Sequence, residues 1–134
     1  MSKYVEHARR LRAIITPHYN CAQSVVVPFA EDAGIPEETA MRFAANFGGG
    51  MKMASVCGAV TGGLMVLGLF GKDDPAILRR YYHTLKERHE GYLDCANLLR
   101  INSERGGVKK PHCDAMVYEC VQLVEEILTD EGTI

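Results

Sequence analysis

The sequence predicts an all-α fold: one compact domain over residues 1–134, with about six or seven helices around a glycine-rich central helix. Apolar residues recur at intervals of three and four along most of the chain, as on one face of a helix. Proline, glycine and N-cap residues divide this pattern into segments of helical length. The sequence has no alternating β-branched run and no Asn-Gly or Asp-Gly hairpin signal.

Three helices are expected before the glycine-rich stretch. The first spans residues 3–15 and ends before Pro17, because the residue preceding proline avoids helical geometry. The second spans residues 20–33, with Pro28 expected to kink or split it. The third runs from Pro36 to about Phe47. Their expected core residues are Val5, Ala8, Leu11, Ile14, Ile15, Val25, Val26, Phe29, Ala30, Met41, Ala44 and Ala45.

The central helix follows the triple glycine Gly48–Gly50. No charged residue occurs from Met53 to Phe70, so this segment is expected to be buried. Ser55 is the expected N-cap, and Gly71 marks the expected end. A membrane span is the alternative, since 18 uncharged residues reach the lower limit for crossing a bilayer. Four glycines in the run and the absence of tryptophan favour a buried helix instead.

Two glycines in this segment define a narrow helix face. Gly58 and Gly62 lie four residues apart, so they share a face that lets another group approach closely. A glycine inside a helix costs about 1 kcal/mol relative to alanine, so close packing or a site is expected to offset it. We therefore consider Gly58 and Gly62 as candidate cofactor-binding positions, or as the interface of a homodimer.

Three further helices are expected in the second half. One begins at Asp73-Asp74-Pro75 and ends near Gly91, a short one covers residues 93–101, and the last begins at Pro111 after a polar loop at 102–110. The expected core residues are Ile77, Leu78, Tyr81, Tyr82, Leu85, Met116, Val117, Cys120, Val124 and Ile127 or Leu128.

Composition limits the function classes. Apolar residues make up 47% of the 134 residues, which is typical of a globular domain. The net charge is −2, with no long run of either sign, which argues against nucleic acid or an anionic membrane as partner. The first residues lack an apolar signal region, so a cytoplasmic location is expected.

Five cysteines are the unusual feature of the composition. An odd number at wide spacing does not fit the disulfide framework of a small secreted domain. Cys21, Cys57, Cys95 and Cys113 are each expected in the first turn of a helix. Free amides and the helix dipole stabilise a thiolate there, and a thiolate is both a nucleophile and a metal ligand.

Several chemistries are open if these four cysteines meet. They could form a dithiol/disulfide couple or relay, or a tetrathiolate site for an iron–sulfur cluster or zinc. No Cys-x-x-Cys is present, so a site would have to be assembled by the tertiary fold. Buried, inert cysteines in a helical interaction domain are the remaining reading.

The fifth cysteine and two histidines near the other four are expected to have structural roles. Cys120 lies on the inward side of the last helix and is expected in the core. His18 and His112 lie near Cys21 and Cys113, where they could tune a thiolate or complete a metal site, although an exposed position is the commoner case.

Three segments resemble one known family. Asn20-Cys21-Ala22-Gln23-Ser24, Phe47-Gly48-Gly49-Gly50 and the block from Cys57 to Gly68 are similar to the small prokaryotic proteins named C_GCAxxG_C_C. The resemblance covers nearly the whole chain. It implies a redox-active protein whose four cysteines fall on Cys21, Cys57, Cys95 and Cys113, with Cys120 additional. Val56 stands where the name has its leading glycine.

The expectation from residues and resemblance together is a redox protein with clustered cysteines. Cys57 is the expected central thiolate and Cys21 its expected partner, in a disulfide couple or an iron–sulfur electron carrier. The alternative is a structural zinc site in a protein-binding module. The expected partner is a redox protein of unspecified identity, and the sequence does not decide whether the chain is an enzyme.

Overall fold

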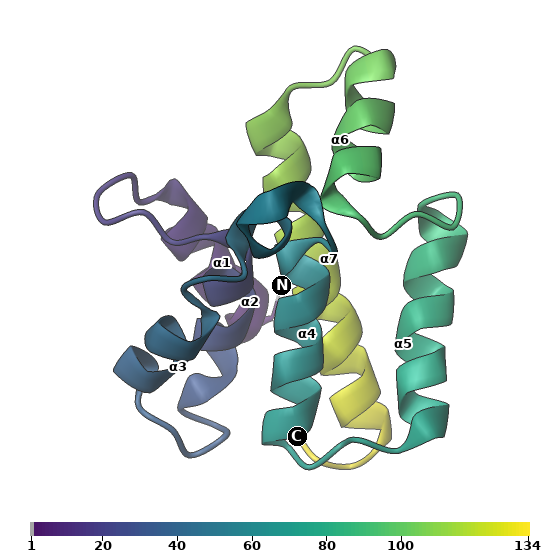
Figure 1. Ribbon diagram of the computed structural model, residues 1–134. Coiled ribbons are helices and arrows are strands. Elements are labelled where there is room, and N and C mark those ends of the chain that lie inside the picture. Colours follow the sequence, from purple (N-terminus) through teal and green to yellow (C-terminus); the bar gives the residue numbers. More distant parts are fainter. Residues whose placement is uncertain (1) are drawn as a thin grey trace.

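The computed structural model describes residues 2–134, which form seven α-helices and one short π-helix (Figure 1). The only extended pairing within this range is an isolated antiparallel bridge between Val56 and Asp94. The predicted all-α class is therefore confirmed. The helices are α1 (Lys3–Ala13), α2 (Cys21–Ala30), α3 (Glu37–Ala44), the π-helix η1 (Gly50–Ala54), α4 (Gly58–Leu69), α5 (Pro75–Arg88), α6 (Cys95–Glu104) and α7 (Lys109–Asp130).

Four helices form the centre of the fold. α4 packs mainly against α2 and α7, which also contact each other, and α1 lies against both α2 and α7. The other elements are peripheral: α3 packs on α2, α5 and α6 pack on α7, and η1 contacts α6. Figure 1 shows η1, the start of α4 and α6 near the N-terminal half of α7, so several helix starts gather at one end of the molecule.

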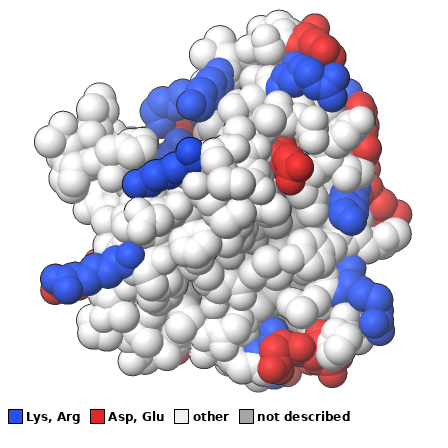
Figure 2. All heavy atoms as spheres, viewed as in Figure 1, with Lys and Arg blue, Asp and Glu red and all other residues white. Residues whose placement is uncertain are grey.

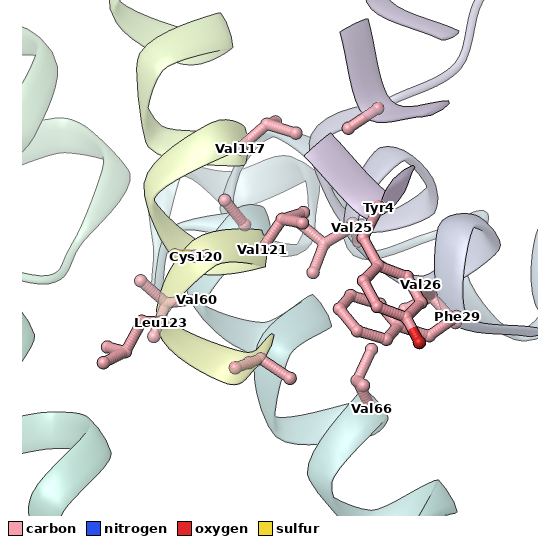
Figure 3. Packing of buried hydrophobic residues seen from close by; sticks show 14 of the residues in the cluster. Tyr4, Val25, Val26, Phe29, Val60, Val66, Val117, Cys120, Val121 and Leu123 are labelled. Atoms are coloured by element: carbon pink, nitrogen blue, oxygen red, sulfur yellow. The ribbon is translucent and has the colours of Figure 1, made fainter. Parts of the chain in front are cut away.

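The core lies where α1, α2, α4 and α7 meet. Figure 3 shows Val117 and Val121 of α7 directed toward Val25 of α2. Tyr4 of α1 stacks on Phe29, with ring centroids 4.2 Å apart. Burying such side chains supplies the main driving force for folding, at roughly 25 cal/mol per Å² of apolar surface.

Most predicted core residues are buried, but two at the end of α1 are not. Ile14 and Ile15 are 39% and 83% exposed, although the helical pattern places them inward. The reason is that α1 ends at Ala13, so the two isoleucines follow the helix in a turn. Pro28 does not split the second helix, since α2 runs without a break from Cys21 to Ala30.

Helix α4, which follows the triple glycine, begins later than predicted. Its N-cap is Cys57, whereas Ser55 belongs to the extended segment beside residue 95. The preceding residues Gly49–Lys52 all have positive φ angles, so the chain makes a left-handed turn before α4. The predicted end is correct: Gly71 has φ +74°, and the Lys72 amide donates to the Leu67 carbonyl at 2.8 Å.

The Gly58 and Gly62 face is covered within the chain. A Cβ atom at Gly62 would lie 3.0 Å from the Ala22 carbonyl oxygen, and one at Gly58 would lie 2.7 Å from the Phe47 carbonyl oxygen. The two glycines thus let α4 approach α2 and the loop before η1. A homodimer interface on this face is therefore wrong, because α2 already occupies it. Gly62 is buried in this packing and Gly58 lines the pocket described below, and a cofactor-binding role for the two glycines stays a prediction.

The last helix begins earlier than predicted. α7 starts at Lys109 instead of Pro111, which places Cys113 in its second turn. Likewise α6 extends to Glu104, three residues beyond the predicted end. As for the membrane alternative, none of the helices in residues 2–134 has both the length and the apolar character needed to cross a bilayer.

Candidate functional site

The four cysteines singled out from the sequence line one pocket. Cys21, Cys57, Cys95 and Cys113 surround a cavity of about 180 Å³ at the end of the molecule where the helix starts gather. All four are free thiols. The wall also contains apolar side chains and four basic ones: Leu98, Leu99, Met116, Arg12, His18, Lys109 and His112. The expectation that separate helices bring their sulfur atoms to one place is met.

Local structure fixes the position of Cys21 as the first residue of α2. Asn20 caps this helix through a capping box, in which its side-chain oxygen accepts from the Gln23 amide at 2.8 Å. The Gln23 side chain in turn accepts from the Asn20 amide at 2.9 Å. The Asn20 side chain also donates to the Ala45 carbonyl at 3.0 Å, which ties the start of α2 to the end of α3.

The isolated bridge places Cys57 beside the segment of Cys95. The Cys57 amide donates to the Leu93 carbonyl at 2.8 Å, and the Cys95 amide donates to the Ser55 carbonyl at 2.6 Å. These two hydrogen bonds hold the start of α4 against the start of α6. The pair of cysteines is therefore positioned by backbone contacts that no helical pattern in the sequence predicts.

Cys21 and Cys113 form the most polarised pair in the pocket. Their sulfur atoms share a hydrogen bond, which the Cys21 thiol donates to Cys113. This bond, helped by the positive charges of Arg12 and Lys109, lowers the pKa of Cys113 to about 6. The pKa of Cys21 is raised by the same bond and by burial. The pair thus holds one thiolate and one thiol at neutral pH.

Arg12 is a residue of the site that was not predicted from the sequence. Its side chain is only 7% exposed, and its Nε atom donates to Asp114 Oδ1 at 2.7 Å. A guanidinium nitrogen also donates to the Tyr19 carbonyl at 2.9 Å, so the group is held firmly beside Cys21 and Cys113. A signal was present, because Arg12 lies seven residues after Val5 and thus on the apolar stripe of α1.

The remaining two thiols of the pocket stay protonated at neutral pH. Burial raises the pKa of Cys57 to about 11, although the Val60 and Ala59 amides favour its thiolate. Burial also raises the pKa of Cys95, with a further rise from the nearby Cys113. The expectation that helix starts lower the pKa of all four cysteines is corrected, because burial outweighs the amides. Cys113, not Cys57, carries the thiolate.

Cys120 lies outside the pocket, as predicted. It is fully buried on α7, and burial raises its pKa well above the ordinary value. Its neighbour Tyr81 is also fully buried and donates to the Val60 carbonyl at 2.8 Å. Cys120 is therefore a core residue.

The two histidines near the cysteines do line the pocket, but neither replaces a thiol. His112 is half-buried, and burial lowers its pKa, with a further lowering from His89. His89 itself hydrogen-bonds Glu119 at 2.8 Å. His18 is exposed at the rim.

The metal alternatives lack a preformed ligand set. Within residues 2–134, no group of three or more histidine, cysteine, aspartate or glutamate side chains is arranged to hold a metal ion. The tetrathiolate considered for Cys21, Cys57, Cys95 and Cys113 is therefore not formed in this conformation.

Comparison with known proteins identifies the family. A family model described as "Putative redox-active protein (C_GCAxxG_C_C)" matches residues 19–127. No curated protein and no solved structure gives a significant match. The matched range contains all four pocket cysteines and most of the chain. The chain therefore belongs to the C_GCAxxG_C_C family, and the resemblance seen in its motifs is confirmed.

Proposed function

We propose that this member of the C_GCAxxG_C_C family is a thiol–disulfide redox protein that cycles between a Cys21/Cys113 dithiol and a Cys21–Cys113 disulfide. The observation that carries the proposal is that Cys21 and Cys113 line one pocket with Arg12, where hydrogen bonding from Cys21 lowers the pKa of Cys113. A thiolate in contact with a second thiol is the arrangement that thiol–disulfide exchange requires. The family description supports redox activity without specifying the reaction.

The exchange takes place in two steps. The Cys113 thiolate attacks one sulfur of a substrate disulfide, forming a mixed disulfide and releasing the other substrate sulfur as a thiolate. The Cys21 thiol then transfers its proton to the released thiolate and attacks the Cys113 sulfur. This second attack expels the remaining substrate sulfur as a thiolate. The protein loses two electrons and the substrate disulfide gains them.

The residues around the pair have distinct parts in this reaction. Arg12 favours the thiolate form of Cys113, and Asp114 holds Arg12 in place through the 2.7 Å ion pair. Cys21 acts as the resolving thiol, and its raised pKa keeps it protonated until Cys113 has reacted. Cys57 and Cys95 line the same pocket and are available as a second thiol pair.

Peptide mapping after mild oxidation tests the proposal. The reduced protein is treated with an excess of an oxidised dithiol and digested under conditions that block thiol exchange. We expect the Cys21–Cys113 disulfide to be the first to form, and to be lost in Cys21→Ser and Cys113→Ser but not in Cys120→Ser. A first disulfide that involves other cysteines, or none, contradicts the proposal.

A second measurement addresses the alternative chemistry. Protein prepared without oxygen is examined for visible absorption and for bound iron and zinc. We expect less than one metal ion per chain and all five thiols to be titratable after unfolding. Stoichiometric iron with visible absorption would instead assign the four pocket cysteines to a cluster.

A further inference from the structure

The mouth of the thiol pocket carries an excess of positive charge. Arg12 and Lys109 line the pocket beside Cys113, and Lys110 contacts Arg12; within residues 2–134 the one carboxylate paired with these three cations is Asp114. Asp114 is shared, because it accepts from Arg12 at 2.7 Å and from Lys110 at 3.2 Å. Lys110 also donates to the Arg12 carbonyl at 3.0 Å. Two of the three cations are thus already bound to protein groups.

Lys109 is the cation that remains available. It is exposed at the first position of α7, it lines the pocket, and among the described residues no carboxylate lies within ion-pair distance of it. Its charge acts on both Cys113 and Cys95. Figure 2 shows positive side chains at the upper left of this face, the side on which Figure 1 places the start of α7, with little acidic surface beside them.

The wall and the size of the pocket limit what can enter. Leu98, Leu99 and Met116 give the cavity an apolar side, which suits methylene groups and sulfur. The volume of about 180 Å³ is below the range of roughly 300–1,000 Å³ found for drug-sized ligands. A short aliphatic chain fits this space, with its charged end left at the rim.

We infer that the pocket accepts a small aliphatic disulfide that carries a carboxylate, with Lys109 as the residue that positions the carboxylate. The inference rests on the proposed thiol–disulfide function and adds the substrate class. The reacting sulfur meets Cys113, the adjoining methylenes lie against Leu98 and Met116, and the carboxylate meets Lys109. No new covalent step is added, because the exchange is the one described above.

The charge balance also predicts how affinity follows the redox state. Disulfide formation removes the negative charge of Cys113, so Arg12, Lys109 and Lys110 then face Asp114 alone. An anion at the rim is attracted more strongly to the oxidised protein than to the reduced one. By linkage, a carboxylate bound there favours the disulfide form.

Three disulfides that differ only in their end groups test the inference: 3,3′-dithiodipropionate, bis(2-hydroxyethyl) disulfide and cystamine, which are anionic, neutral and cationic. The rate of mixed-disulfide formation at Cys113 is measured by acid quenching and mass spectrometry. We expect the anionic compound to react about fivefold faster than the neutral one, and the cationic compound to react slowest. Raising the salt concentration should reduce this preference.

Variants of Lys109 show whether its charge positions the substrate carboxylate or only changes the reactivity of the Cys113 thiolate. Lys109→Gln should remove the anionic preference, and Lys109→Glu should reverse it. The reaction rate of the neutral disulfide is measured in each variant at a pH where Cys113 is fully ionised. This rate corrects for any change in the reactivity of the Cys113 thiolate. Lys86→Gln, which replaces an exposed lysine on α5, is the matched control and should leave all three rates unchanged.

The possible results separate the two proposals. Equal rates for the three disulfides, a faster cationic compound, or an anionic preference that survives Lys109→Gln would overturn the inference while leaving the exchange reaction intact. A failure of all three compounds to react at Cys113 would overturn the proposed function together with it.

Discussion

Cys113 and Cys120 lie seven residues apart on α7, about two turns of the same helix, yet their surroundings have opposite effects. Around Cys113, α1 contributes Arg12 and α2 contributes the Cys21 thiol, and the pKa of Cys113 falls to about 6. Around Cys120 the neighbouring helices contribute apolar side chains and Tyr81, and the pKa rises well above its ordinary value. The helix spaces the two thiols, and the packing partners decide their chemistry.

The largest effect that this comparison predicts is on thiol reactivity. Cys113→Ser should reduce the rate of iodoacetamide labelling of the native protein at pH 7 by about 100-fold. The reason is that a thiol whose pKa is about three units higher than that of Cys113 is only about 1% ionised at pH 7. Cys120→Ser should leave the rate unchanged. Labelling kinetics followed by mass spectrometry measure both, and a loss of fast labelling in Cys120→Ser would reverse our assignment of the two cysteines.

The next effect concerns the cause of the low pKa at Cys113. The labelling rate of Cys113 should rise with pH through about 6, because only the deprotonated sulfur reacts. Arg12→Gln should move this transition to higher pH and slow labelling at pH 6 about tenfold. Asp114→Asn should move it to lower pH, since Asp114 raises the pKa of Cys113.

Arg42→Gln provides the control for these two variants. Arg42 pairs with Glu38 on the surface of α3, and its side chain does not line the pocket. Its pH profile should match that of the parent protein. If Arg12→Gln and Arg42→Gln gave the same profile, the hydrogen bond from Cys21 and not Arg12 would be the cause of the low pKa of Cys113.

The smallest predicted effect is on stability, and it tests how closely α4 packs against α2 in the core. Gly62→Ala should lower the free energy of unfolding by about 1–3 kcal/mol, because a Cβ atom there would press on Ala22 and Val25. Gly68→Ala, in the same helix, should raise it by up to about 1 kcal/mol, since nothing lies within 4 Å of its Cβ position. Urea denaturation measures both, and equal effects would mean that α4 and α2 do not pack this closely.

The helical class could be predicted from the sequence because apolar spacing and breaker residues act locally. Cys120 and Val117 fall on the inward stripe of α7, and both are buried. Gly71 ends α4 through its positive φ angle, as expected of glycine in that position. The start of α4 was harder to predict: Ser55 is a good N-cap by type, yet its carbonyl accepts from the Cys95 amide instead, and Cys57 is the N-cap.

The sequence predicts which cysteines form the site, but it does not predict which of them is ionised. The positions of Cys21, Cys57, Cys95 and Cys113 follow from the segments that carry them, and all four line the pocket. Their ionisation depends on burial and on charges that arrive through the tertiary fold. Arg12 reaches the pocket across 102 residues of sequence to pair with Asp114, and no local pattern links the two.

The position of Arg12 has a consequence for the family as a whole. The match to the family begins at residue 19, so α1 and its arginine lie outside the region by which members are recognised. The cysteine motif therefore supplies the sulfur atoms and the hydrogen bond from Cys21, while the charge of Arg12, which lowers the pKa of Cys113 further, comes from an N-terminal helix that can diverge separately. Proteins that share all four cysteines can differ in working pH and in oxidising strength, and grouping them by the residue that contacts Cys113 would reveal such subfamilies.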